Sequence, residues 1–290
     1  MSSRTPPLLE PHLLSLPQPS SLTLLTSVLG ASTNWLLTRH LHALLKPSSP
    51  SPTTAPSNLL PLSNTPAPAR GPPPSPSQTA PPRAPETSVL FLSLLRDLPF
   101  WRETEVSGAR GGGVDLDLAA ARKHFAFVDG LSSLGLGGGT VAEVRRTVLD
   151  KVGELKRGGG IGGDGEGRKV VLVVDGLDYL LAVAGGSAVE IKDMLAEWRE
   201  HTHAAIVTVA ADDPLIKEQE TTLGKQHAWF ALSLAHEADT LLSLRLLDTG
   251  AARDVSGVIR ITHHGDRADD HEYLYYVGGD GGVRVFERGQ

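Results

Sequence analysis

The chain has 290 residues, with 27 Lys and Arg against 33 Asp and Glu, a formal net charge of −6 and no cysteine. The absence of cysteine excludes disulfide scaffolds, Cys-ligated zinc, iron–sulfur clusters and thiol nucleophiles. The acidic balance argues against strong nonspecific coating of DNA, and the sequence contains no apolar run of the length that spans a membrane.

The prolines are distributed very unevenly. Of 21 prolines, 14 fall within residues 47–85, in a stretch rich in Ser and Thr and without an aromatic residue. Such a composition cannot bury enough apolar surface to offset its ordering entropy, so we predict a disordered insertion over 47–87. Pro-x-x-Pro ligands for an SH3-type partner are the alternative use of this stretch. The Gly-rich segments 108–113 and 158–167 are predicted as loop expansions, and 1–290 as a single domain.

Short apolar runs that favour strands alternate with amphipathic helical stripes over the first two thirds of the chain. We predict strands at 21–29, 88–95, 125–128, 170–174 and 205–209, and helices at 35–45, 99–105, 141–155 and 189–201. Continuously apolar strands joined by helices are typical of a parallel sheet covered on both faces.

The last third of the chain has a different pattern. We predict strands at 229–234, 240–246, 258–262, 273–277 and 283–287, with Gly-Gly-Asp-Gly-Gly joining the final two in a hairpin. The predicted fold class is therefore α/β, with a mostly parallel sheet flanked by helices and an antiparallel C-terminal extension.

Two loops resemble phosphate-binding loops in part. Leu29-Gly-Ala-Ser-Thr-Asn-Trp35 follows the first predicted strand, but it has one Gly and no Lys to neutralise a terminal phosphate. Gly130-Leu-Ser-Ser-Leu-Gly135 has the two-glycine spacing, yet Leu-Gly follows where Lys-Ser/Thr is required. We predict no competent ATP site on either loop. A divergent NTPase that uses Gly130–Gly135 and Asp175, a carboxylate at a strand end, is the alternative.

Other chemistry has little support in the sequence. No Gly-x-Ser-x-Gly elbow anchors a hydrolase triad. The histidines have no carboxylate at a standard ligand spacing and are predicted to be solvated or packed; they include His201, His203, His263, His264 and His271. We therefore predict no catalytic, cofactor-binding or metal-binding residue.

A basic cluster lies on the predicted helix 141–155. Arg145, Arg146 and Lys151 are candidate contacts to RNA phosphates. Acidic residues interleave with them, which equally fits an exposed helix face of mixed charge. The sequence leaves both interpretations open.

Four segments in chain order resemble the sixth subunit of the Elongator complex in its fungal form. They are Val-Leu-Gly-Ala-Ser-Thr-Asn-Trp at 28–35, Phe-Ala-Phe-Val-Asp-Gly-Leu at 125–131, Val-Leu-Val-Val-Asp-Gly-Leu-Asp at 171–178, and Leu-Arg-Leu-Leu-Asp-Thr-Gly-Ala-Ala-Arg-Asp-Val-Ser-Gly-Val-Ile-Arg at 244–260. The last segment is the most specific. The resemblance covers most of the chain outside the Pro-rich and Gly-rich stretches.

The resemblance implies a RecA-like fold that lacks the Walker A lysine, and a subunit that is not an enzyme and needs no cofactor. It implies a hetero-hexameric ring with two related RecA-like subunits, the fourth and fifth of the complex. This ring would dock on the catalytic Elongator subcomplex, bind tRNA and support modification of the wobble uridine at carbon 5. A location in the cytoplasm and also in the nucleus follows, without a membrane partner. A pure assembly scaffold without RNA contact is the alternative.

The resemblance also assigns roles to individual residues. A ring subunit buries two different sides against its neighbours, and Asp248, Arg253 and Asp254 are the candidate interface. These residues equally fit turns. Asn34, Trp35 and Asp175 are the candidate vacated nucleotide site. In it, Asn34 would cap the helix and Trp35 would fill the space of the nucleotide.

Overall fold

The computed structural model describes residues 5–14, 16–46, 87–108, 114–135, 139–157, 168–247, 252–264 and 270–287. Nearly all of the predicted insertion at 47–87 lies outside the described residues, as does the Gly-rich segment 158–167. In the segment 108–113, only Gly108 is described, as the last residue of a helix. Those predictions therefore stay predictions.

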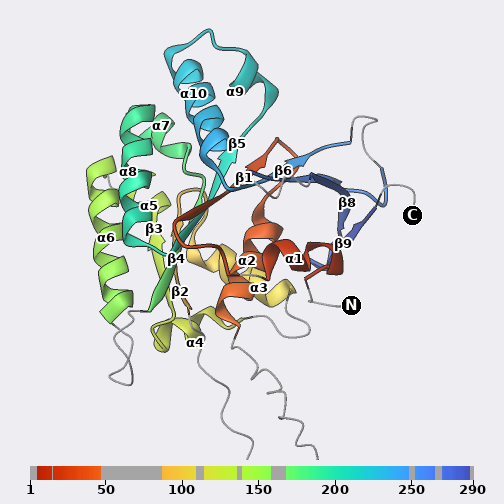
Figure 1. The fold of residues 1–290 in the computed structure, drawn as a ribbon, viewed down its shortest axis with the longest axis horizontal. Helices are drawn as coiled ribbons and strands as arrows, with labels where there is room; N and C mark the ends of the chain where they lie inside the picture. Colours follow the sequence, from red (N-terminus) through yellow and green to blue (C-terminus); the bar gives the residue numbers. More distant parts are fainter. Residues whose placement is uncertain are drawn as a thin grey trace, which may run out of the picture.

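One sheet runs through the described part of the chain (Figure 1). Its parallel strands are β1 (Ser21–Ser27), β2 (Thr87–Ser93), β3 (Phe125–Asp129), β4 (Lys169–Asp175), β5 (Ala204–Ala210) and β6 (Thr240–Arg245), and its antiparallel strands are β7 (Gly257–His263), β8 (His271–Val277) and β9 (Val283–Phe286). The strand order is β3-β2-β4-β5-β1-β6-β7-β8-β9. The mostly parallel sheet and the antiparallel extension are confirmed.

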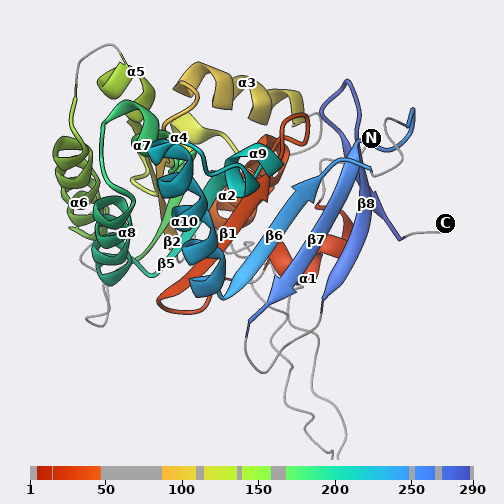
Figure 2. The same ribbon diagram turned by 90° about the horizontal axis from the view of Figure 1, so that it is seen from above.

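Helices cover both faces of the parallel part of the sheet (Figure 2). One layer has α5 (Gly130–Gly135), α6 (Val141–Arg157), α7 (Tyr179–Val183), α8 (Ala188–His201) and α10 (Thr222–Glu237). The other has the turn η1 (Pro7–Leu9), α1 (Glu10–Leu13), α2 (Asn34–Leu45), α3 (Leu98–Gly108) and α4 (Leu116–Ala121). The short helix α9 (Asp213–Lys217) lies beside α10.

Each layer closes its own hydrophobic core. Trp198 is fully buried among the valines of α6 and the sheet, whereas Trp101 is fully buried with Phe91 on the opposite face. The strands between these layers are buried on both faces, which is why β2 and β4 read as continuous apolar runs rather than alternating ones.

The predicted strand at 229–234 is wrong, because these residues lie within α10. His227, Phe230, Ala231 and Leu234 are buried at the spacing of one helix face, while Trp229 is 45% exposed. A six-residue apolar run does not distinguish a strand from a buried helix segment. The N-cap residue Thr221, whose hydroxyl accepts the Gly224 N–H at 3.0 Å, is the start signal that the prediction missed.

Helix α2 packs between the sheet, α1 and α3, and most of its side chains are buried. Its buried residues include His40, which is 5% exposed and whose Nε2 has no hydrogen-bond partner in the described part of the chain. Burial disfavours the charged imidazolium and lowers the pKa of His40 to about 4. The fold therefore requires this imidazole to be neutral.

We expect His40 to make the fold sensitive to acid. Its folded pKa lies below the unfolded value of 6.5, so the unfolded chain binds more protons between pH 6.5 and about 4. This contribution is fully present above pH 6.5 and is lost as the pH falls to about 4, to a total of about 3 kcal/mol. Urea unfolding of the parent and of His40→Gln should show a shallower loss of stability in this window for the variant. Equal slopes would contradict a neutral, buried His40.

Candidate functional site

The carboxyl ends of β1, β2, β4 and β5 meet at one edge of the sheet, the edge at which open α/β sheets bind ligands. A cavity of about 310 Å³ lies there. Its lining includes the loop at 27–34 after β1, Leu95 and Arg96 after β2, Gly176 and Asp178 after β4, and Thr208, Ala210 and Asp212 at the end of β5. We refer to it as the carboxyl-edge cavity.

The loop after β1 is closed by a carboxylate of its own chain. The Leu29 N–H donates to Asp212 Oδ1 at 2.6 Å, across 183 positions of sequence. Gly30 has φ +89°, in the left-handed region that favours glycine. Backbone N–H groups of such a loop are the donors that a phosphate needs. Asp212 engages one of them and adds a negative charge that repels an anion.

Asp175 lies just beneath the cavity and is 1% exposed. It accepts hydrogen bonds from Ser93 Oγ at 3.2 Å and Thr208 Oγ1 at 3.4 Å, and Arg96 is 3.5 Å away. Burial raises the pKa of Asp175, while Arg96 and both hydroxyls act in the opposite direction. The carboxylate is thus engaged by its own chain, as expected of a structural group.

Asp178 also faces inward. Its Oδ2 accepts the Ala210 N–H at 3.3 Å and lies 3.2 Å from His227 Nε2, which ties β4 to β5 and to α10. The charged residues that line the carboxyl-edge cavity are Arg96, Asp178 and Asp212 among those described. The summed formal charge of these three residues is negative, and the guanidinium of Arg96 is already ion-paired with Asp175. This arrangement does not fit a polyphosphate.

The structure corrects the roles expected of two residues. Asn34 does not cap the helix, since the N-cap residue is Thr33 and no side chain caps it. Trp35 does not line the carboxyl-edge cavity. It packs against Tyr275 of β8, with ring centroids 5.2 Å apart, and lines a neighbouring pocket of about 570 Å³. The aromatic contact with Tyr275, on the antiparallel extension of the sheet, therefore holds Trp35 outside the polar carboxyl-edge cavity.

Gly130–Gly135 is a helix, α5, that begins directly after β3. The carboxylate of Asp129 accepts both the N–H and the hydroxyl of Ser132, at 2.8 and 2.7 Å, so it takes the first-turn donor. A Cβ on Gly130 would lie 2.5 Å from Leu94 Cδ2. Close packing against β2 therefore explains this glycine without a phosphate.

The candidate RNA contacts lie on the exposed face of α6. Arg145 is ion-paired with Glu197 of α8, and Lys151 with Glu154 at 2.7 Å. Arg146 is exposed. Surface pairs of this kind are worth little, so they reduce the local positive charge without preventing an RNA contact. The candidate interface is only partly described. Arg253 and Asp254 are exposed before β7, and Asp248 lies outside the described residues.

The structure brings His12 beside two histidines, His263 and His271, that lie near the other end of the sequence. His12 Nδ1 is 3.1 Å from His263 Nε2, and its ring is 5.2 Å from that of His271. Burial, followed by the neighbouring His263 and His271, lowers the pKa of His12. No group that could hold a metal ion is found in the described part of the chain. The contacts among these histidines hold α1 against β7 and β8.

Arg96, Thr208 and Asp212 were missed by the sequence analysis. All three follow or end predicted strands, so a search for polar residues at strand ends would have found Asp212. No sequence signal indicates that its carboxylate would reach Leu29 N–H rather than solvent.

No family model matches the chain. The chain is similar to the Elongator complex protein 6 homolog of Schizosaccharomyces pombe, with 24% identity over 221 residues, which covers 70% of this chain and 80% of that protein. Its fold is similar to that of a KaiC-like protein from Pyrococcus horikoshii, with a TM-score of 0.52, 15% identity and coverage of 98% and 97% of the two chains. The expected α/β fold with a RecA-like core is therefore confirmed. None of the helices in the described residues has the length and apolarity needed to cross a bilayer.

We expect Asp212 to hold the loop after β1 in place. Asp212→Ala should accelerate amide hydrogen exchange at residues 28–31 about tenfold, because a hydrogen bond to a charged group is worth roughly 1.5 kcal/mol. The matched control is Asp213→Ala, since Asp213 is exposed and pairs with Lys217 at 2.6 Å on the surface. Equal exchange in the two variants would show that Asp212 does not restrain the loop.

Proposed function

We propose that the chain is a noncatalytic subunit of an Elongator complex. The observation that carries this proposal is the hydrogen bond from Leu29 N–H to Asp212, which closes the loop where an NTPase would hold phosphate. The similarity to the Schizosaccharomyces pombe protein supports the same conclusion. A RecA-like core with this loop closed serves assembly rather than nucleotide turnover.

In this proposal the chain joins two related RecA-like subunits, the fourth and fifth, in a hetero-hexameric ring. The ring docks on the catalytic subcomplex, binds tRNA and supports modification of the wobble uridine at carbon 5, in the cytoplasm and the nucleus. Exposed leucines surround the carboxyl-edge cavity and favour a protein neighbour there. Leu29 is 86% exposed, Leu246 46% and Leu95 43%.

A scaffold without RNA contact is the second candidate. The ion pairs of Arg145 and Lys151 favour it, because they leave Arg146 as the exposed member of the cluster without a carboxylate partner among the described residues. The first candidate requires tRNA to contact this subunit within the ring, whereas the second requires only its assembly.

Native mass measured with and without the two partner subunits tests the assembly. We expect a discrete hexamer only in the mixture, and no ATP hydrolysis that depends on Asp175 in this chain. Crosslinking of bound tRNA to α6 then separates the two candidates. A chain that ignores both partners would overturn the proposal, and turnover abolished by Asp175→Asn would favour the divergent NTPase.

We expect Leu29 to contribute to the ring. Leu29→Asp should weaken assembly at least tenfold, since a charge at an apolar interface is left desolvated and unpaired. The stability of the isolated chain should change by less than about 0.5 kcal/mol, because the side chain is exposed. Leu118→Asp on α4 is the control, with a side chain 46% exposed away from the cavity. Equal assembly of both variants would show that Leu29 does not contribute to the ring interface.

A further inference from the structure

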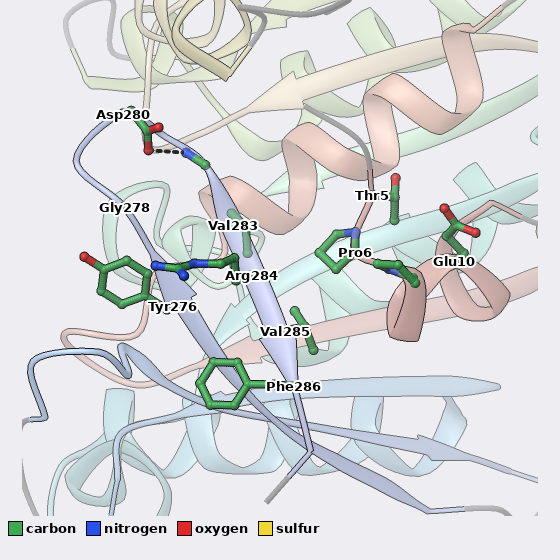
Figure 3. A pocket seen from close by; sticks show the side chains of 12 residues that line it. Thr5, Pro6, Glu10, Tyr276, Gly278, Asp280, Val283, Arg284, Val285 and Phe286 are labelled. Atoms are coloured by element: carbon green, nitrogen blue, oxygen red, sulfur yellow. Dashed lines mark hydrogen bonds between the residues drawn. The ribbon is translucent and has the colours of Figure 1, made fainter. Parts of the chain in front are cut away.

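The outer edge of β9 ends the sheet, and a second cavity lies against it (Figure 3). This cavity has a volume of about 630 Å³, twice that of the carboxyl-edge cavity. One wall is β9 itself. The other is the N-terminal segment with Thr5, Pro6 and Glu10, which Figure 3 shows across from the strand.

The register of the hairpin shows which backbone groups of β9 face outward. The Gly278 N–H donates to Gly282 O at 2.8 Å, and the next pair that can exchange hydrogen bonds is Tyr276 with Arg284. Because bonded and non-bonded pairs alternate in an antiparallel ladder, the N–H and C=O groups of Val283 and Val285 point away from β8.

No backbone partner for these outward groups is found among the described residues. The facing segment contributes Pro6 and Pro7, which have no N–H to donate to a carbonyl of β9. Within the described part of the chain the outward edge of β9 is therefore unpaired, and such an edge is a template for pairing with another segment.

One of the three arginines near this edge has no carboxylate partner among the described residues. Arg245, Arg260 and Arg284 share the outer face of the antiparallel strands. Arg245 is paired with Glu272 at 3.3 Å and Arg260 with Asp270, whereas Arg284 lies over the Tyr276 ring at 5.2 Å and has no carboxylate partner among the described residues.

Two carboxylates line the cavity, but neither serves Arg284. Asp280 accepts the Gly282 N–H at 3.0 Å within the hairpin turn. Glu10 is in the first turn of α1 on the opposite wall. In Figure 3, Arg284 and Phe286 of β9 project to the same side of the sheet as Tyr276 of β8.

We propose that the β9 edge binds an extended acidic segment of another protein, which adds a strand to the sheet and places a carboxylate against Arg284. Main-chain bonds to Val283 and Val285 supply affinity, and alternate side chains supply specificity. RNA is disfavoured on this face, because the other two arginines are already neutralised by their own carboxylates.

The test uses the full-length chain alone, so its outcome does not depend on the ring. A display library of random eight-residue peptides is selected on the protein, and the enriched peptides are measured by fluorescence anisotropy. We expect alternating apolar residues with an acidic residue between them. Arg284→Glu should weaken these peptides at least tenfold and should turn the selection toward Lys and Arg, because it reverses the charge.

Backbone pairing is tested with Val285→Pro. This change removes an outward N–H and no bond to β8, so peptide binding should fall at least tenfold. Thermal unfolding should shift only by the partly buried contact that the Val285 side chain makes with the core. Arg260→Glu, on the same face but two strands inward, is the control and should leave binding unchanged.

Several results would overturn the proposal. They are an absence of enriched peptides, and enriched peptides that bind Arg284→Glu and Val285→Pro as tightly as the parent. Tight binding of oligouridylate that Arg284→Glu abolishes would instead assign this face to RNA. Should Val285→Pro unfold, the charge reversal at Arg284 still decides the question.

Discussion

The architecture depends on β1, which hydrogen-bonds to a parallel strand on each side. Ser21–Ser27 pair with Ala204–Ala210 of β5, and β6 lies along the other edge. Asp239 fixes the start of β1 by accepting the Leu22 N–H at 2.7 Å. Since β1 and its neighbour β6 connect the strands from β5 to β3 with the antiparallel strands, the position of β1 determines both the carboxyl-edge cavity and the placement of the β9 edge.

Carboxylates take the positions at which a nucleotide-binding fold would engage phosphate or metal. Asp212 accepts a loop N–H, Asp129 accepts the first-turn N–H of α5, and Asp175 is buried with Arg96 and two hydroxyls. Asp212 and Asp129 each engage a backbone N–H that a bound phosphate could otherwise use, and Asp175 is satisfied within the core. The chain thus lacks a Walker lysine, and its own carboxylates also engage backbone N–H groups that would otherwise be available to a phosphate.

Most strands are predictable from the sequence because their apolar runs are long and bounded by glycine or charge. The run at 229–234 is misleading, because it belongs to a helix whose buried face can be recognised only when His227 is included. Within the site, the missing lysine was readable, whereas the bond from Leu29 to Asp212 was not. Contacts between distant loops follow from strand order, and so does the packing of Trp35 on Tyr275 rather than into the vacant cavity.

The pairing of β1 with β5 has a consequence for the chain during its synthesis. Leu29 and Asp212 are 183 positions apart, and the strands that precede them are paired in the same register. At translation rates of about 5–20 residues per second, β1 waits roughly 10–40 s for its neighbour. Throughout that time an apolar strand with two unpaired edges is exposed outside the ribosome. Until then, unpaired edges of β1 are templates for pairing with other strands, so correct folding depends on their staying free until β5 and β6 have been made.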